Sequence, residues 1–286
     1  MGQVIISGLQ VGSSYALMAL ALVLVLKATD VPNFAMAEMG LLPAFVVWIA
    51  LAHLHLNYAL AILLGVACGF LLGMVIEKGF IRPIIAHSHF TAVFMTIGLF
   101  YALNSIVALL WSSEPRAVRS PFSGTFTVGD TVVSHHAVVA VGVGFAIMLG
   151  LHVFFRTQAG VQMRAVAEDR VTPRLLGVRL PRVFRLAWGM AGVISTIAVV
   201  LTAQANVLND QTGQTLILTG FVAATLGGFS SIVGAFVSGL ALGVVENLAG
   251  TYISTASASA IALLTVVVVL LLRPDGLFGE MRAREI

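Results

Sequence analysis

The chain alternates long apolar runs with short polar connections. The apolar runs lie at 4–26, 36–53, 58–76, 91–111, 136–155, 184–205, 214–228, 232–249 and 257–272. A membrane-spanning helix needs about 20 mainly apolar residues, because in hydrocarbon its backbone groups must pair within the segment. The second and seventh runs are short or interrupted, so the pattern predicts eight to ten spans. The fold class expected is all-α, a polytopic transmembrane helical bundle.

The polar connections are too short to fold independently. The longest one before the middle of the chain, at about 112–135, contains prolines and glycines and suits a short hairpin or a surface helix. Residues 1–286 are therefore expected to form a single transmembrane domain. The first run ends at Lys27, with no basic segment before it and no convincing cleavage site, so it predicts a retained helix rather than a signal peptide.

Composition agrees with a membrane protein. Hydrophobic residues make up 59% of the chain and charged residues 9%, and the mean hydropathy is +1.04. The single cysteine, Cys68, excludes an internal disulfide framework. The formal net charge of +3 does not require a nucleic-acid partner, because an excess of lysine and arginine in cytoplasmic loops explains it.

The distribution of cations predicts the orientation. If the nine runs alternate across the membrane, thirteen of the fifteen lysines and arginines fall on one side, and only Arg116 and Arg119 fall on the other. Cytoplasmic loops carry the excess of positive charge. The N-terminus is therefore expected outside and the C-terminus in the cytoplasm.

One connection, at 156–185, stands out because it carries seven arginines. Within it, the stretch from Thr172 to Gly177 predicts a short helix that Thr172 caps, that Pro173 begins and that Gly177 ends. Such a helix would leave Leu175 and Leu176 exposed unless a partner covered them. The alternative is that the loop only anchors the topology on anionic lipid.

Small residues recur at four-residue spacing on several runs. Gly65, Gly69 and Gly73 align on the third run, and Gly239 and Gly243 on the eighth. Such ridges let helix backbones approach closely, so they predict helix–helix packing. Lining of a pore by the same ridges is the alternative.

Two acidic residues lie near membrane depth. Ionisable groups there are costly and are therefore candidates for function, which makes Glu38 and Glu246 candidates for a translocation path. The alternative is that each lies near an interface and pairs with a neighbouring helix. Pro32 predicts a broken, re-entrant segment before Glu38, in which the amide of Asn33 satisfies freed backbone groups.

No pattern for catalysis, cofactor binding or a metal site is found. Six of the seven histidines occur in pairs at helix ends, His53 with His55, His87 with His89 and His135 with His136, without a cysteine or carboxylate cluster, so they are interpreted as interfacial residues. The chain has no phosphate-binding loop of the Gly-x4-Gly-Lys-Ser/Thr type, so it is not expected to bind ATP itself. It is therefore not expected to be an enzyme.

Several stretches resemble one family of transport proteins. Met163-Arg164-Ala165, Ala167-Glu168-Asp169 and Leu175-Leu176-Gly177-Val178 resemble the coupling loop of branched-chain amino acid ABC importer permeases. The first-helix stretch from Gly12 to Leu17, the Asn33-Phe34-Ala35 segment with Glu38, and the glycine-rich stretch from Thr225 to Glu246 are similar to that family as well. The resemblance covers nearly the whole chain.

The resemblance implies a permease subunit in the cytoplasmic, or inner, membrane of a bacterium. Its implied partners are a second permease, expected to be a related but non-identical chain, two cytoplasmic ATPases that bind the ATP, and an extracytoplasmic binding protein. Residues implied in coupling to the ATPases are Arg164, Glu168, Asp169, Arg174, Leu175, Leu176 and Gly177. Residues implied in the translocation path are Asn33, Phe34, Met36, Glu38 and Glu246.

The substrate implied is a small polar solute such as a branched-chain amino acid. One departure weakens that assignment, because Met36-Ala37 stands where the family usually has His-Gly. Urea, short amides and aromatic or other carboxylates are therefore alternatives within the same class of importer. A stand-alone secondary transporter or channel is the alternative from another class, and it would leave the exposed leucine turn unexplained.

Overall fold

The computed structural model describes residues 1–85, 89–129, 131–169, 171–254 and 258–279. The first half contains α1 (Gly2–Thr29), α2 (Met36–Ala52), α3 (Tyr58–Ile76), the π-helical turn η1 (Glu77–Ile81), α4 (Arg82–Ile85) and α5 (His89–Trp111). The strands β1 (Thr125–Val128) and β2 (Thr131–Ser134) follow, then α6 (His135–Phe154), α7 (Gln158–Glu168) and α8 (Thr172–Leu175). The last part contains α9 (Leu180–Ala205), α10 (Thr212–Gly227), α11 (Ile232–Tyr252) and α12 (Ala258–Leu272).

The helical bundle expected from the sequence is confirmed, and each apolar run coincides with a helix. Within the described residues, six helices are long and apolar enough to cross a membrane, namely α1, α3 with its extension through α4, α5, α6, α9 and α11. α2 and α12 are apolar but shorter, and α10 has 16 residues. The total of eight to ten spans therefore stays a prediction. The hairpin considered for the long connection is present as the antiparallel pair β1–β2.

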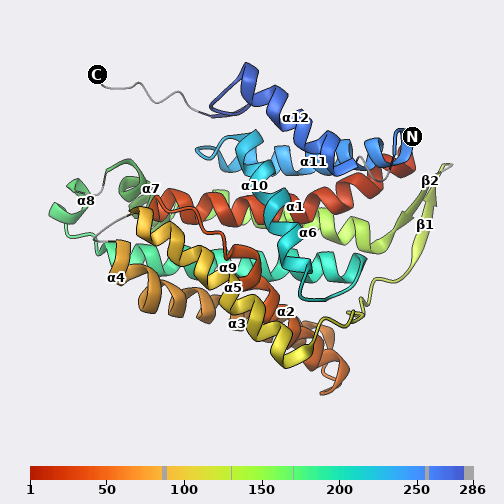
Figure 1. Cartoon of the computed structure of the whole chain (residues 1–286), viewed down its shortest axis with the longest axis horizontal. Coiled ribbons are helices and arrows are strands. Elements are labelled where there is room, and N and C mark those ends of the chain that lie inside the picture. The colour runs from red at the N-terminus through yellow and green to blue at the C-terminus, as the bar shows by residue number, and fades with distance from the viewer. Residues whose placement is uncertain (86–88, 130, 170, 255–257, 280–286) are drawn as a thin grey trace.

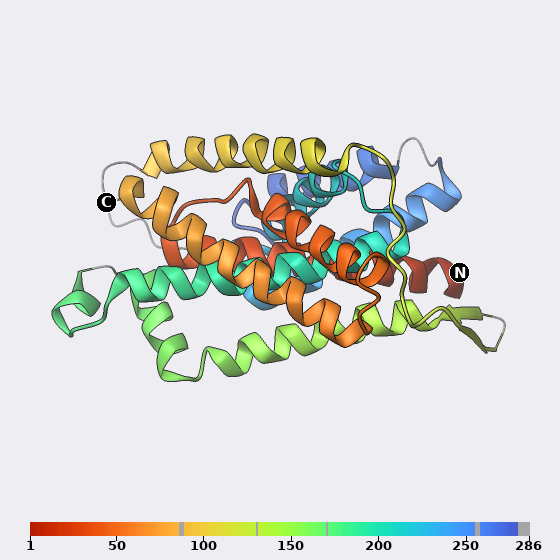
Figure 2. The same ribbon diagram turned by 90° about the horizontal axis from the view of Figure 1, so that it is seen from below.

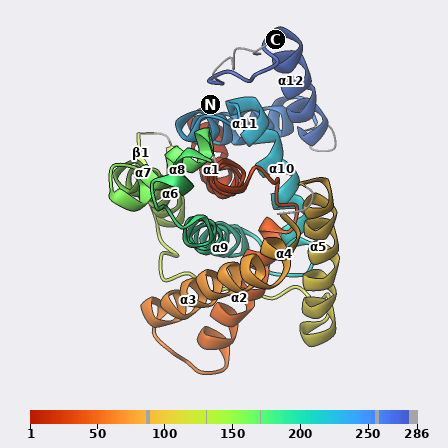
Figure 3. The same ribbon diagram turned by 90° about the vertical axis from the view of Figure 1, so that its left-hand side faces the viewer.

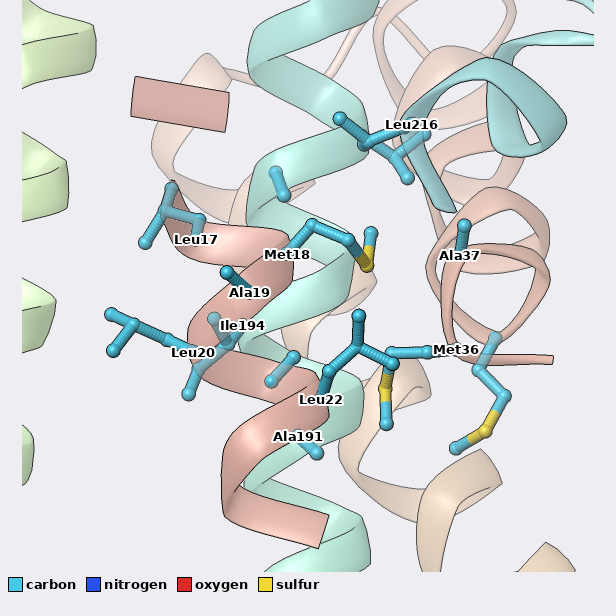
Figure 4. Packing of buried hydrophobic residues seen from close by; sticks show 14 of the residues in the cluster. Leu17, Met18, Ala19, Leu20, Leu22, Met36, Ala37, Ala191, Ile194 and Leu216 are labelled. Atoms are coloured by element: carbon cyan, nitrogen blue, oxygen red, sulfur yellow. The ribbon is translucent and has the colours of Figure 1, made fainter. Parts of the chain in front are cut away.

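α1 is the centre of the bundle. Seen along the long axis, it is surrounded by α11, α9, α10 and α6, while α5 and α12 lie at the periphery (Figure 3). Its residues from Ala16 to Val25 are almost completely buried. Figure 4 shows Leu17, Met18 and Leu22 of α1 among side chains of α9, α2 and α10. A helix that is apolar on all sides is buried in protein rather than on one face only.

Glycines allow close contacts between helices. A methyl group at Gly243 of α11 would meet the backbone of Gly12 on α1, and one at Gly239 would meet the backbone of Ala16. On α3, methyl groups at Gly69 and Gly73 would meet α9, and one at Gly65 would meet Val47 of α2. The described contacts of both glycine ridges are thus with neighbouring helices.

The elements run up and down between two ends of the molecule. One end carries the N-terminus, the β1–β2 hairpin and the connection before α10, and we call it the hairpin end (Figure 1). The other carries α4, α7 and α8, and we call it the α8 end; α7 and α8 project there beyond the bundle (Figure 2). Contacts tie each end together: Lys27 Nζ donates to Ser230 O at 2.6 Å at the α8 end, and Arg116 pairs with Leu208 at the hairpin end.

The cations follow this division. Lys27, Arg82, the described arginines of 156–185 and Arg273 belong to the α8 end, while Arg116 lies at the hairpin end. Arg170, Arg282 and Arg284 lie outside the described residues. The chain is therefore asymmetric in charge along its long axis, in the direction that the sequence predicts.

Candidate functional site

The basic connection at 156–185 contains two short helices. α7 begins after Thr157, whose hydroxyl accepts a hydrogen bond from Gly160 N at 3.3 Å, and it runs for 11 residues. α8 is a single turn, and Gly177 follows it with a φ of +84°. That left-handed conformation suits glycine, so the helix stop expected at Gly177 is confirmed. We call residues 158–177 the coupling segment.

The cap of α8 differs from the sequence prediction. Thr172 was the expected cap, but Val171 precedes the helix and no side chain at that position caps it. Asp169 does so from farther upstream: its carboxylate accepts from Val171 N and Thr172 N, each at 2.9 Å, and from the Thr172 hydroxyl. A carboxylate reaches more donors than a hydroxyl and also complements the positive helix start, which explains the exchange of roles.

Two leucines project from this capped turn. Leu175 is 83% exposed and Leu176 is 80% exposed. Beside them, α7 and α8 enclose a groove of about 420 Å³ that is lined by Val161, Gln162, Ala165, Glu168, Asp169, Thr172, Pro173, Leu176 and Val178. Arg164 and Arg174 are exposed on the same two helices. The segment therefore presents apolar side chains surrounded by charge, which is the usual anatomy of a protein interface.

The coupling segment is firmly attached to the bundle. Met163 and Val166 of α7 are buried, and Gly160 lies against the carbonyl of Phe154 at the end of α6. α7 also packs against α1 and α9. Near the start of α9, Arg82 of α4 donates to Pro181 O at 3.3 Å and forms a salt bridge with the buried Glu77 at 2.5 Å. A displacement of α8 would therefore reach the bundle through α7, which contacts α6, α1 and α9.

A second candidate region is the break between α1 and α2. After Asp30 the chain enters the bundle in non-helical form, and α2 begins inside it (Figure 1). Asn33 behaves as predicted, because its side-chain oxygen accepts from Ala35 N at 3.0 Å. Phe34 is 36% exposed and stacks on Phe221 of α10 at a centroid distance of 4.8 Å. Met36 is completely buried, and its carbonyl accepts from the Ser195 hydroxyl at 2.6 Å.

Glu38 lies in a polar cluster at the start of α10. Its side chain is fully buried beside Gly213, and Asn104 of α5 donates to its Oε2 at 3.5 Å. The same Asn104 amide donates to Asp210 O at 2.8 Å. Glu38 Oε1 and Asp210 Oδ1 are buried without a hydrogen-bond partner among the described residues. A buried carboxylate next to a helix start is favoured by the helix dipole.

Glu246 lies elsewhere. Tyr15 of α1 donates to its Oε2 at 2.8 Å, and Ser259 of α12 donates to its Oε1 at 3.0 Å. Both carboxylate oxygens are therefore engaged between α1, α11 and α12. The structure does not bring Glu246 together with Glu38, whose neighbours belong to α5 and α10.

Several residues of these regions were missed from the sequence. α7 was not foreseen, although Thr157 as a cap and the spacing of Met163 and Val166 are signals for a short amphipathic helix. Thr96, whose hydroxyl accepts from Phe34 N at 3.3 Å, and Asn104 carry no such local signal. Their partners are more than 60 positions away in sequence, so only the fold reveals them.

The sequence matches a known family over most of its length. Residues 4–272 match the family described as branched-chain amino acid transport system / permease component. Among curated proteins, the chain is 31% identical to the high-affinity branched-chain amino acid transport system permease protein LivH of Salmonella typhimurium, covering 99% of this chain and 97% of that protein. It is 29% identical to the corresponding permease protein BraD of Pseudomonas aeruginosa, with the same coverage.

A solved structure shares the fold. A chain of PsaBC from Streptococcus pneumoniae, determined in complex with a Fab, superposes with a TM-score of 0.50 at 17% identity. The match covers 95% of this chain and 89% of that chain. At this level of identity the likeness concerns the arrangement of helices only.

Proposed function

The chain belongs to the family of permease components of branched-chain amino acid transport systems, and we propose that it forms one membrane-spanning half of an ATP-driven importer. As a permease it is a multi-pass membrane protein and a transport subunit rather than an enzyme. The observation that carries the rest of the proposal is the capped turn with Leu175 and Leu176 more than three-quarters exposed. A stand-alone channel would have no use for such a turn.

The coupling segment is the proposed contact with an ATPase. Leu175 and Leu176 would insert into a cleft of that subunit, and Arg164, Glu168 and Arg174 would form the charged rim. Closure of two ATPases on ATP would displace α8, and α7 would pass the movement to α6 through Gly160 and to α9 through direct packing. Transport would then follow from two permeases rocking against each other.

The other partners follow from the two ends. The α8 end would face the cytoplasm of a bacterium, because the described cations gather there. The hairpin end would face outward and meet the extracytoplasmic binding protein. The second permease is proposed to be a related but non-identical chain.

A branched-chain amino acid is the proposed solute, as the names of the curated relatives suggest. The departure at Met36-Ala37 argued for urea, amides or other carboxylates instead. Met36 and Ala37 are completely buried, so in this conformation neither side chain lines an accessible path. Their apolar character therefore gives no reason to prefer another solute, and the branched-chain assignment stands as the main proposal.

The test is reconstitution of the permease pair with its ATPases and binding protein in liposomes. ATP-dependent uptake of L-leucine, with no uptake when ATP is omitted, is expected. Orientation is tested separately with cysteines at the exposed positions Gln162 and Ser123 in a Cys68→Ser background. Gln162→Cys should react with an impermeant reagent only from the cytoplasmic side and Ser123→Cys only from outside. Labelling of both from one side would refute the proposed topology.

A further inference from the structure

A cleft at the hairpin end lies outside both regions described so far. It opens between α1, α9 and the start of α10 and has a volume of about 270 Å³. This leaves room for a small organic solute rather than a single water molecule. Its polar lining includes Gln10, Ser14, Thr202, Asn206, Gln211 and Thr215. We call it the outer cleft.

The lining combines two kinds of surface. Hydroxyl and carboxamide groups, which both donate and accept hydrogen bonds, line the cleft together with the apolar side chains of Val11, Leu201 and Leu216. Asn206, Gln211 and Thr215 are exposed residues in this lining. Polar groups that converge on a partly apolar hollow are the usual features of a small-molecule site.

The lining is also free of formal charge. Its one ionisable side chain is Tyr15, whose hydroxyl already donates to Glu246 at 2.8 Å. A solute with a net charge would lose hydration there without gaining an ionic partner, which is unfavourable. A zwitterion also loses hydration, but its two opposite charges attract each other and leave no net charge, so the cost is smaller than for an uncompensated ion.

We propose that the outer cleft is a binding site for a small amphipathic solute of zero net charge, such as an aliphatic α-amino acid in its zwitterionic form. This inference rests on the proposed function and deepens it, because the solute would bind within one permease subunit before crossing. The apolar side chains would contact the aliphatic group, and the hydroxyl and amide groups would contact the ammonium and carboxylate groups. Net charge, rather than shape alone, would decide which solutes bind.

The test measures protection of a cysteine in the cleft. Asn206→Cys in the Cys68→Ser permease, complexed with its second permease and ATPases but without binding protein, is labelled with an impermeant maleimide. Gln211→Cys serves as a second reporter if Asn206→Cys does not fold. L-Leucine and the neutral 4-methylpentanamide should slow labelling several-fold. The anion 4-methyl-2-oxopentanoate and the cation 3-methylbutylamine, which have the same branched chain, should not.

Two controls separate occupation of the cleft from a general effect. Ser123→Cys, exposed in the connection before the hairpin, should label at the same rate with or without leucine. Ala205→Phe, at the end of α9, should fill the cleft and abolish protection of the reporter. Ala52→Phe, at the corresponding end of α2 and outside the cleft, should leave protection unchanged.

Failure of the inference about the cleft can be told apart from failure of the proposed importer function. Equal protection by all four compounds, or by none, would overturn the inference about the cleft. Leucine uptake is measured in parallel on the complete, unsubstituted importer. Uptake without protection would reject the outer cleft while leaving the importer assignment intact. Protection without uptake would support the cleft and contradict the importer assignment.

Discussion

The α1–α11 contact and the coupling segment differ in where their apolar groups lie, because the first is packed inside the protein and the second is exposed. Between α1 and α11 the closest atoms belong to the backbones of Gly12 and Gly243, so hardly any side chain separates the helices. In the coupling segment, Leu175 and Leu176 extend away from the protein and contact little of it. The first contact is formed within one chain, whereas the second is proposed to be covered by a partner. Substitutions in the first region should therefore impair folding, and substitutions in the second should impair partner binding.

The largest effect is expected for a bulky residue in the α1–α11 contact. In Gly243→Leu the side chain would meet the backbone of Gly12, which cannot move aside as a flexible side chain could. Overpacking of this kind costs about 3 kcal/mol, a large part of a typical protein's stability of about 5–15 kcal/mol. Most of the folded protein should be lost, as measured by the monodisperse fraction on size-exclusion chromatography. Gly142→Leu, whose position has open space around it, should behave like the wild type.

The next largest effect is expected for the two exposed leucines of the coupling segment. Leu175→Ser/Leu176→Ser should lower ATPase co-purification by at least tenfold, because loss of a buried anchor costs about 2 kcal/mol or more. The yield of folded permease should not change, since both side chains are exposed. Arg174→Gln/Arg182→Gln is the matched control and should reduce co-purification far less. The reverse pattern would favour the lipid-anchor interpretation of the loop.

A third test concerns Glu38, the buried carboxylate inside the bundle. Glu38→Gln keeps the shape of the side chain and the neighbourhood of Asn104 but removes the charge. A hydrogen bond to a charged group is worth about 1.5–3 kcal/mol, so leucine uptake should fall about tenfold if the carboxylate serves transport. In Glu246→Gln one of the two hydroxyls still donates to the amide oxygen and the other can accept from the amide NH2, so uptake should be retained. If Glu38→Gln lowers the yield of folded protein and the remaining protein transports normally, Glu38 is structural.

The smallest effect is expected at the helix cap. Asp169→Ala removes the acceptor for Val171 N and Thr172 N, and loss of a cap costs about 1 kcal/mol. The turn that holds the leucines would loosen, and leucine-stimulated ATP hydrolysis should fall about fivefold. Asp169→Asn keeps an acceptor and should restore most of the activity. Equal loss in both variants would mean that the charge of Asp169, rather than the cap, matters.

The sequence predicts the helices of the bundle more completely than the details of the coupling segment. Apolar runs such as 58–76 and 36–53 coincide with α3 (Tyr58–Ile76) and α2 (Met36–Ala52), because hydrophobic length is a local property. The short helix of the basic connection was located correctly, and Gly177 ends it as expected. The identity of its cap was wrong, because the choice between Asp169 and Thr172 depends on the loop conformation and not on residue type alone.

The polar cluster at Glu38 was predicted only in part. Glu38 and Asn33 were singled out because an acid and a proline break inside an apolar region are unusual. Asn104 and Asp210 were not, because each is an ordinary polar residue in its local context and becomes significant only next to the start of α10. The outer cleft was not foreseen for the same reason, since α1, at the start of the chain, forms it together with α9 and α10 from the second half of the chain.

The burial of α1 by α11 has a consequence for biogenesis. Translation produces α1 first, yet Tyr15 finds its partner Glu246 only 231 residues later. Until then the face with Gly8 and Gly12 has no backbone to pack against, although α1 is apolar enough to remain in the lipid. Insertion and assembly must therefore be separate stages for this chain. A ribosome that stalls before α11 would leave inserted helices without their central contact, which makes such fragments natural substrates for membrane quality control.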